Sequence, residues 1–363
     1  MDFSVATARA RRLSLSTGEI TGAVGDSVTV LPVVVAVAAL TELRLPVLLL
    51  WFGAFQIVWG LWYGSPVSVE PMKALAALVI AGSLTVPELA TAGLLSGGVL
   101  LAFGAAGALG ALAERVDDAV IRGVQVAVAL VLARTGLELG AGAPTVALGA
   151  AAAGLAVAAV GYPRASALVV LALGAGVAGA ATGLPSVAIP DVRPSIALAP
   201  TADALAATGA QLAMTVGNAA VATSLLLEDL YDADVSPDEL SASMGAMNLL
   251  AVPLGGLPMC HGSGGVAGKY AFGARTAGAN LVLGALYVGA ALGAAEVVAA
   301  FPLAALGVVL VIVAAQLGRS GLRTDSPGLT VGVGILGAAT NVGLAFAVGI
   351  VASVALGRVR SGA

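Results

Sequence analysis

Long apolar segments follow one another through this chain, and they constrain its fold more than any other feature of the sequence. A run of about 20 apolar residues spans the hydrocarbon core of a bilayer as one helix. Of the 363 residues, 59% are hydrophobic and only 10% are charged, which leaves too little polar surface to cover a water-soluble globule. The sequence therefore predicts an all-α polytopic protein of the cell (plasma) membrane.

The apolar segments form two groups, one on each side of a polar stretch. The first group lies at about 22–40, 46–64, 67–82, 86–112, 119–139, 143–161 and 165–184. The second group lies at about 204–227, 241–257, 259–272, 276–295, 297–317 and 328–357. The last segment is long enough for two short helices joined at GAATN, so we expect 12 to 14 transmembrane helices. The runs are continuous rather than alternating, which argues against an outer-membrane barrel.

Basic residues and segment boundaries together predict the domain organisation. Most of the 16 Lys and Arg fall on the side of the N-terminus, so we expect both termini to be cytoplasmic. The first apolar stretch contains Asp26 and continues past Pro32, which favours a retained span over a cleaved signal peptide. The predicted units are a cytoplasmic segment at 1–20, a first inverted repeat at 21–184, a connecting loop at 185–203, a second inverted repeat at 204–357 and a cytoplasmic C-terminus at 358–363.

The composition disfavours several classes of function. A net charge of −4 argues against nucleic-acid binding. Cys260 is the only cysteine and His261 the only histidine, so neither a disulfide framework nor a four-ligand metal site is expected. With so few reactive side chains and no soluble domain, an enzyme or a sensor is disfavoured, and we expect no cofactor.

An irregular pattern occurs once in each half of the chain. GAVGD ends at Asp26 and is followed 45 residues later by a Pro-Met pair at 71–72, while MTVGN ends at Asn218 and is followed 40 residues later by a second pair at 258–259. Seven spans in each half would place the second copy upside down relative to the first. The third span of each half is short and broken by Pro or Gly, which predicts discontinuous helices whose N-termini meet near the midplane. Such N-termini favour an anion.

The first break, SPVSVEPMKA, places a lysine in the first turn of a helix that starts inside the membrane. Lys73 opposes the helix dipole there unless a negative charge lies close. Two interpretations stay open: Lys73 pairs with Glu70 or Asp26 as a structural element, or it helps to hold a bound anion.

The second break, LPMCHGSGGVAGKYAFGAR, is rich in glycine around Ser263, so its backbone can approach a solute closely. It lacks the spacing of a P-loop, which gives no support for ATP binding. His261 either packs and donates hydrogen bonds or takes part in substrate or proton binding, and Cys260 suggests no chemistry of its own.

At these residues the chain resembles the molybdate transporters of plants, algae and prokaryotes, which are distant relatives of the sulfate permease group. The resemblance runs from about residue 22 to 317 and rests on six motifs: GAVGDSVTVLP (22–32), PVSVEPMKA (66–74), RGVQ (122–125), NAAVAT (218–223), PMCHGSGGVAGKYAFGAR (258–275) and FPLAALGVVL (301–310). It implies a 7+7 inverted repeat, in which a core domain of spans 1–4 and 8–11 moves against a gate domain of spans 5–7 and 12–14.

The chain departs from the family pattern at three places. Glu70 and Lys269 stand where the family usually has Gln, and the Pro often found after Gln211 is absent. Glu70 matters most, because a carboxylate beside an anion site repels an oxyanion unless it is protonated or paired. It either supplies proton coupling or indicates a different substrate.

The sequence and the resemblance together predict a secondary transporter that imports a tetrahedral oxyanion. Molybdate is the leading substrate; the alternative is sulfate or another solute, such as a nucleobase, carried by the same fold. Importing an anion against an inside-negative potential costs roughly 2.3 kcal/mol per charge per 100 mV, so we expect proton symport. The expected partners are the lipid bilayer, an inorganic oxyanion (molybdate, sulfate or tungstate) and H⁺, while a homodimer is left open.

The candidate site residues form two sets. The expected substrate-binding residues are Ser68, Val69, Glu70, Met72, Lys73, Gln211, Thr215, Asn218, His261, Gly262, Ser263 and Gly264. The candidates for proton coupling are Asp26, Glu70 and His261. Arg122 and Gln125 match a family motif, but the sequence alone suggests no physical role for them.

Overall fold

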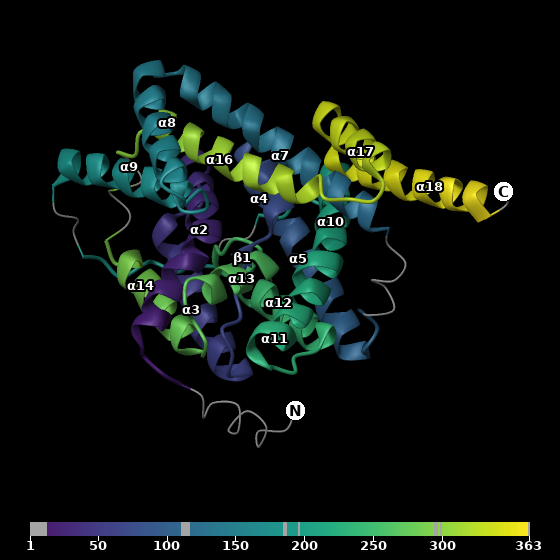
Figure 1. The fold of residues 1–363 in the computed structure, drawn as a ribbon, viewed down its shortest axis with the longest axis horizontal. Helices are drawn as coiled ribbons and strands as arrows, with labels where there is room; N and C mark the ends of the chain where they lie inside the picture. The colour runs from purple at the N-terminus through teal and green to yellow at the C-terminus, as the bar shows by residue number, and fades with distance from the viewer. Residues whose placement is uncertain are drawn as a thin grey trace.

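The computed structural model is a bundle of helices that surround two very short strands (Figure 1). The structure describes residues 13–109, 117–183, 187–194, 197–293, 297 and 300–361. Six of the described helices are long and apolar enough to cross a bilayer individually, and the others are shorter or interrupted.

The elements of the two halves follow the same order. The first half contains α2 (Thr17–Leu40), α3 (Leu45–Tyr63), β1 (Val69–Pro71), α4 (Lys73–Ile80), α5 (Val86–Ala106), α7 (Asp118–Ala141), α8 (Pro144–Ala159) and α9 (Ser166–Thr182). The second half contains α10 (Ala202–Met214), η1 (Thr215–Val221), α11 (Ala222–Tyr231), α12 (Pro237–Ala251), η2 (Val252–Leu254), β2 (Met259–His261), α13 (Ser263–Ala271), α14 (Gly278–Ala291), α16 (Leu303–Gly321), α17 (Pro327–Ala339) and α18 (Val342–Ser361).

The helix order confirms the predicted 7+7 architecture. Elements α10, η1 and α11 form one span interrupted by a π-helical turn, and each strand with its following short helix forms another, so the described elements fit fourteen spans. The predicted last segment is indeed two helices, α17 and α18, separated at Thr340 and Asn341. The repeat boundaries at 21–184 and 204–357 remain our proposed division of the chain.

Local sequence signals explain where several helices begin. Thr85 and Glu88 form a capping box at α5, and Ser236 and Glu239 form another at α12. Pro302 is the residue before α16, so this span starts later than the predicted 297–317, because proline is tolerated at a helix start but not in its interior. The fourth span was predicted to run to about 112, but α5 ends at Ala106, where Gly107 caps it; the residues from 110 to 116 lie outside the described part of the chain.

Glycine pairs allow close contact between the helices of the two halves. A Cβ on Gly136 of α7 would lie 2.5 Å from the carbonyl oxygen of Gly307 on α16, and one on Gly307 would lie 2.4 Å from that of Gly136. Gly53 of α3 and Gly284 of α14 approach each other in the same way. Small residues at such contacts are typical of helix packing in membranes.

The helices divide into two groups. We call α7 to α9 and α16 to α18 the gate helices and the remaining helices the core helices. The gate helices lie along the upper part of Figure 1, where α7 packs against α16 and α17. The core helices surround the two strands, and α2, α4 and α10 also contact the gate helices.

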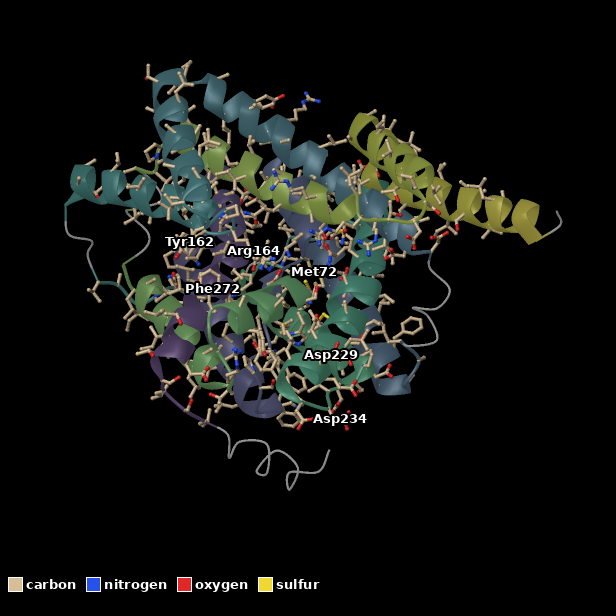
Figure 2. The ribbon with its side chains drawn as sticks, viewed as in Figure 1. Met72, Tyr162, Arg164, Asp229, Asp234 and Phe272 are labelled. Atoms are coloured by element: carbon tan, nitrogen blue, oxygen red, sulfur yellow. The ribbon has the colours of Figure 1, made fainter. Side chains whose placement is uncertain are left out.

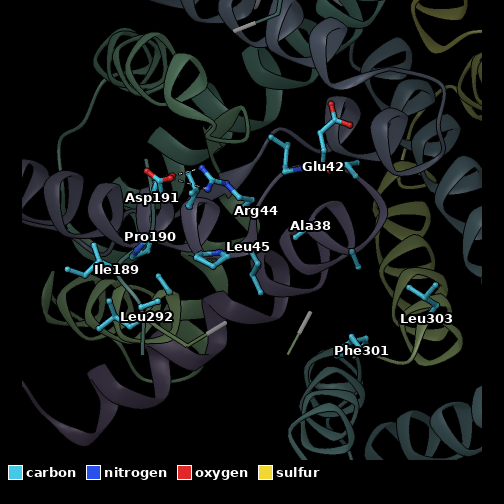
Figure 3. A pocket seen from close by; sticks show the side chains of 17 residues that line it. Ala38, Glu42, Arg44, Leu45, Ile189, Pro190, Asp191, Leu292, Phe301 and Leu303 are labelled. Carbon is cyan, nitrogen blue, oxygen red and sulfur yellow. Dashed lines mark hydrogen bonds and ion pairs between the residues drawn. The ribbon is translucent and has the colours of Figure 1, made fainter. Parts of the chain in front are cut away.

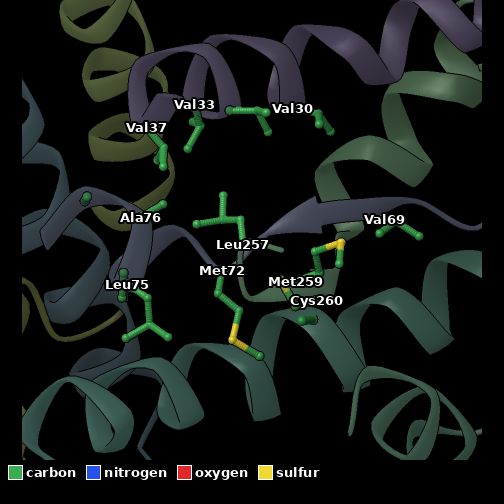
Figure 4. Close-up of a cluster of buried hydrophobic side chains, with 14 of the residues drawn as sticks. Val30, Val33, Val37, Val69, Met72, Leu75, Ala76, Leu257, Met259 and Cys260 are labelled. Atoms are coloured by element: carbon green, nitrogen blue, oxygen red, sulfur yellow. The ribbon is translucent and has the colours of Figure 1, made fainter. Parts of the chain in front are cut away.

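The two strands form an antiparallel pair at the centre of the core helices. Val69 lies opposite His261 and Pro71 opposite Met259. Figure 4 shows the apolar side chains around this strand pair, including Met72 and valines of α2. Met72 is fully buried, whereas Asp234 lies at the lower edge of the molecule in Figure 2. Because each strand leads directly into a short helix, the strand pair brings the N-termini of α4 and α13 together inside the protein.

Candidate anion site at the broken helices

Each broken helix has its N-terminus capped by a side chain of another segment. The amide oxygen of Gln211, on α10, accepts hydrogen bonds from the backbone N–H groups of Ala74 (3.0 Å) and Leu75 (3.4 Å) at the start of α4. A carboxylate oxygen of Glu70, beside β2, accepts one from the N–H of Gly265 (2.7 Å) in α13. These helices begin without a cap from their own N-cap residue, so both positive helix ends depend on the neighbouring half.

Glu70 also forms an ion pair with Lys73. The carboxylate is 1% exposed, whereas the Lys73 side chain is 23% exposed. The pairing agrees with the interpretation in which Lys73 and Glu70 hold each other, but the partial exposure leaves the ammonium group accessible to a solute. Lys73 and the Gly265 N–H therefore converge on one carboxylate, as they would on the oxygens of an anion.

A second ion pair lies deeper in the core. Lys269 Nζ is 3.1 Å from Asp26 Oδ2, and both side chains are fully buried. Lys269 also donates to Gln56 Oε1 (3.0 Å) and Asn280 Oδ1 (2.9 Å), and Ser68 donates to Asp26 Oδ1 (2.6 Å). This complete set of hydrogen bonds is what a buried ion pair requires.

Ser68 links the two ion pairs. Its hydroxyl lies 2.6 Å from Asp26 and 3.5 Å from Glu70 Oε1. The two carboxylates and the two lysines, Lys73 and Lys269, thus form one polar cluster without net formal charge. A dianion placed beside it meets one accessible cation and no uncompensated acid.

A cavity of about 180 Å³ lies between this cluster and the gate helices. Its core side is lined by Val28, Thr29, Val33, Lys73, Ala77, Asn218, Ser263 and Gly264, and its gate side by Gln125, Leu132, Val313, Gln316, Leu317 and Ser320. The predicted residues Lys73, Asn218, Ser263 and Gly264 therefore share one cavity.

Other predicted residues, among them Val69, Met72 and Thr215, do not line the cavity. Thr215 accepts a hydrogen bond from Gln211 Nε2 (2.9 Å), and Ser263 donates to Asn218 Oδ1 (2.7 Å) within the cavity wall. Val69 belongs to the strand pair, and the N–H of Met72 donates to the Pro258 carbonyl (2.8 Å). Those backbone groups connect the two breaks.

Gly262 lies where a side chain could not fit. A Cβ at this position would be 2.0 Å from Glu70 Oε1. The carboxylate can reach the α13 N-terminus only because the residue before that helix is glycine.

His261 lies on the other side of β2, away from the cavity residues. Its two ring nitrogens are 2.9 Å from the Ser68 carbonyl oxygen and 2.8 Å from Ser243 Oγ, and its ring packs edge-on against Trp59 and Tyr63. With both nitrogens engaged and no exposed surface, His261 has the environment of a structural histidine. Cys260 is also buried.

Sequence reasoning missed four polar residues of this region or gave them no role. Gln56 and Asn280 hold Lys269 from α3 and α14, and each is a single amide within an apolar span, which is the signal that could have found them. Gln125 and Gln316 line the gate side of the cavity.

A larger cavity of about 580 Å³ lies elsewhere, between the α2–α3 loop and the connection that contains Asp191 (Figure 3). Arg44 forms an ion pair with Asp191 across it at 4.0 Å. Side chains of the broken helices do not contribute to its lining, so its position does not support a role as the central site.

A membrane protein of two repeats, with two broken helices facing a small cavity that contains a lysine, has the architecture of a secondary transporter. The comparisons with known proteins agree. One family model, described as "Molybdate transporter of MFS superfamily", matches residues 18–132 and 203–317, two stretches of equal length in corresponding positions of the two repeats. The chain belongs to the molybdate transporter family, whose members are transporters rather than enzymes.

Curated relatives cover most of the chain. It is 29% identical to molybdate transporter 2 of Arabidopsis thaliana, in an alignment that covers 87% of this chain and 82% of the relative. It is 28% identical to molybdate transporter 1 of Chlamydomonas reinhardtii, with 95% and 92% covered.

Solved structures share the fold. The transmembrane domain of the cyanobacterium bicarbonate transporter BicA aligns with a TM-score of 0.65 at 19% identity, covering 93% of this chain and 97% of that one. The murine anion transporter Slc26a9, in an inward-facing state, aligns with a TM-score of 0.72 at 13% identity, covering 98% of this chain and 71% of that one. These alignments confirm the predicted fold of the sulfate permease group.

Proposed function

We propose that this protein imports molybdate by proton symport with alternating access between core and gate helices. The observation that carries the proposal is the partly exposed Lys73, which lines a cavity beside the N-terminus of α13. A cation and helix N–H groups at one place provide hydrogen-bond donors for several oxygens of a tetrahedral oxyanion. Membership of the molybdate transporter family supports molybdate as that oxyanion.

The contacts of Glu70 suggest how a proton couples to the anion. In its ionised form Glu70 forms an ion pair with Lys73 and accepts a hydrogen bond from the Gly265 N–H, so neither donor is free for a substrate. A proton on Glu70 removes its charge, so it releases these donors to the substrate. A dianion and a protonated Glu70 would then bind together, whereas the empty site favours the ion pair.

Electrical work makes such coupling necessary for accumulation. Moving two negative charges inward costs roughly 4.6 kcal/mol at 100 mV, twice the cost for one charge. Two protons carried with the dianion would cancel this cost. We assign Glu70 to one of them and keep Asp26 as the candidate for the other.

The position of the cavity supports alternating access. Its walls come from core helices on one side and from gate helices on the other, so a shift of one group relative to the other opens or closes it. Gln125 lies two turns into α7, and Ser320 lies at the end of α16, both towards the end of the molecule that carries the Arg122 side chain. We propose that this end is cytoplasmic, together with both termini, and that the protein lies in the plasma membrane.

Uptake into proteoliposomes tests the proposal directly. We expect labelled molybdate to accumulate when the outside is more acidic than the inside, and we expect a sodium gradient alone to have no effect. Glu70→Gln should weaken the response to the proton gradient, since glutamine cannot take up a proton and only the proton assigned to Asp26 would still be coupled. Uptake that follows sodium and ignores pH would refute proton symport.

Competition identifies the substrate. Unlabelled tungstate, which has the charge and shape of molybdate, should compete most strongly, and sulfate should compete less. Because Glu70 is engaged by Lys73 and Gly265, it is not a free acceptor for a nucleobase, and uracil should not compete. Stronger competition by uracil or sulfate than by tungstate would contradict the assignment of molybdate.

Lys73→Ala should weaken molybdate binding at least about tenfold, because a hydrogen bond to a charged group contributes about 1.5–3 kcal/mol. Titration calorimetry of the purified protein measures this. Arg134→Ala is the matched control, since Arg134 is an exposed cation on α7 that pairs with Glu138 and with no other acid among the described residues. An unchanged affinity in Lys73→Ala would remove this residue from the site.

A further inference from the structure

Two glutamines on the gate helices line the cavity, and each has one buried amide atom without a hydrogen-bond partner in the part of the chain that the structure describes. Gln125 on α7 is 5% exposed, and its Oε1 has no hydrogen-bond partner among the described residues. Gln316 on α16 likewise has an unpartnered, buried Nε2. Both line the cavity opposite Lys73 and Ser263. A buried amide without a partner is costly, so such groups indicate a ligand that completes them.

The packing of α7 against α16 keeps these two amides together. Arg122 Nη1 donates to the carbonyl of Ser320 (3.1 Å) and so connects the start of α7 to the end of α16. Gln125 lies one turn after Arg122, and Gln316 lies one turn before Ser320. The contact of Gly136 with Gly307 fixes the other ends of the same two antiparallel helices. Arg122 is thus a positioning residue for the gate side of the cavity.

We propose that Gln125 and Gln316 form the gate half of the anion site and donate their amide N–H groups to oxygens of the bound oxyanion. This inference rests on the proposed function and adds the residues on the gate side that recognise the oxyanion. The core side then supplies the positive charge through Lys73, and the gate side supplies neutral donors. Gln316 has its Nε2 as the unpartnered atom and can donate directly, whereas Gln125 has its Oε1 there and must turn its carboxamide over to present the NH₂ end.

The division of roles has a physical reason. Neutral donors bind several oxygens of a tetrahedral anion without adding charge, so the empty site keeps its balanced charge. They also link the anion to both groups of helices, so the occupied site joins core and gate. We therefore expect the glutamines to favour the loaded, closed state.

Titration calorimetry of the full-length purified protein tests this proposal, with molybdate, tungstate and sulfate as ligands. Gln125→Met and Gln316→Met keep a similar side-chain volume but cannot donate. Each should weaken molybdate binding about tenfold, because one hydrogen bond to an anion is lost. Gln125→Glu should weaken it further, since a carboxylate offers only acceptors and a negative charge. Thr135→Val, on α7 and outside the cavity, should bind as the wild type does, because the Thr135 hydroxyl only donates to Val131 O.

The outcomes separate this inference from the proposed function. Wild-type affinity in both methionine variants would overturn the inference while leaving molybdate binding intact. If the wild type binds sulfate in preference to molybdate, the assignment of molybdate fails, and the variants then test the same glutamines with sulfate. If the wild type binds none of the three anions, both proposals are wrong.

Discussion

Gly265→Ala should eliminate transport and destabilise the protein by more than about 3 kcal/mol, as expected when a core is overpacked against buried charges. A Cβ at this position would lie 2.1 Å from both Asp26 Oδ1 and Ser68 Oγ. Both atoms belong to the cluster that links the two ion pairs, and neither is the free end of a flexible surface chain. The new methyl group must therefore displace α13 or break the contact between Asp26 and Ser68.

The adjacent residue provides the matched control. A Cβ on Gly264 would have Glu70 Oε1 as its nearest neighbour, at 3.9 Å, which is ordinary contact. The free energy of unfolding of Gly264→Ala should therefore lie within about 1 kcal/mol of that of the wild type, as for other accommodated substitutions. Substrate binding can still change, because Gly264 belongs to the cavity wall. Thermal melting of both purified variants in detergent is the measurement. Equal melting of Gly264→Ala and Gly265→Ala would show that the cluster does not restrict α13.

Lys269→Met should destabilise the protein by about 3–5 kcal/mol, because removing one partner of a buried ion pair leaves the other charge uncompensated. Asp26 and Lys269 are both fully buried. Methionine matches the lysine stem in volume, so the expected loss comes from the charge of Asp26 rather than from a void. The midpoint of thermal unfolding should fall accordingly.

A second substitution separates charge from packing. Asp26→Asn combined with Lys269→Met removes both charges. Asp26 accepts hydrogen bonds from Ser68 (2.6 Å) and from Gln56 Nε2 (2.8 Å), and an amide at this position can still bond to both residues. The double variant should recover most of the stability that Lys269→Met loses, since replacement of a whole buried pair is often nearly neutral. If the double variant is as unstable as Lys269→Met alone, the ion pair is not the source of the effect.

The fold could be predicted from the sequence because the bilayer leaves few alternatives. Length and continuity of the apolar runs specify helices, and the interruptions at Pro71 and Pro258 specify where helices break. The π-helical turn at Thr215–Val221 was not predictable, because no composition signal distinguishes an extra residue in a turn. The turn interrupts the span predicted at 204–227, which the structure extends from Ala202 to Tyr231.

The candidate site was predictable in part. Lys73 and Ser263 were visible because a charge or a glycine-flanked hydroxyl inside a broken span is unusual. The ion pairs could not be predicted, because the sequence offers both Glu70 and Asp26 as partners of Lys73. In the structure, Lys73 pairs with Glu70 and Lys269 pairs with Asp26. The role proposed for Gln125 and Gln316 could not be predicted, because it depends on which helices face each other across the cavity.

The two broken helices are capped by different chemical groups, and this makes the two repeats unequal. Gln211 holds the start of α4 with an amide that stays neutral at any physiological pH, whereas Glu70 holds the start of α13 with a group that can gain or lose a proton. Two halves of common architecture thereby become unequal. Under the proposed mechanism, protonation of Glu70 weakens the contact at the start of α13 and leaves the contact at the start of α4 unchanged, so the two inverted repeats respond differently to pH.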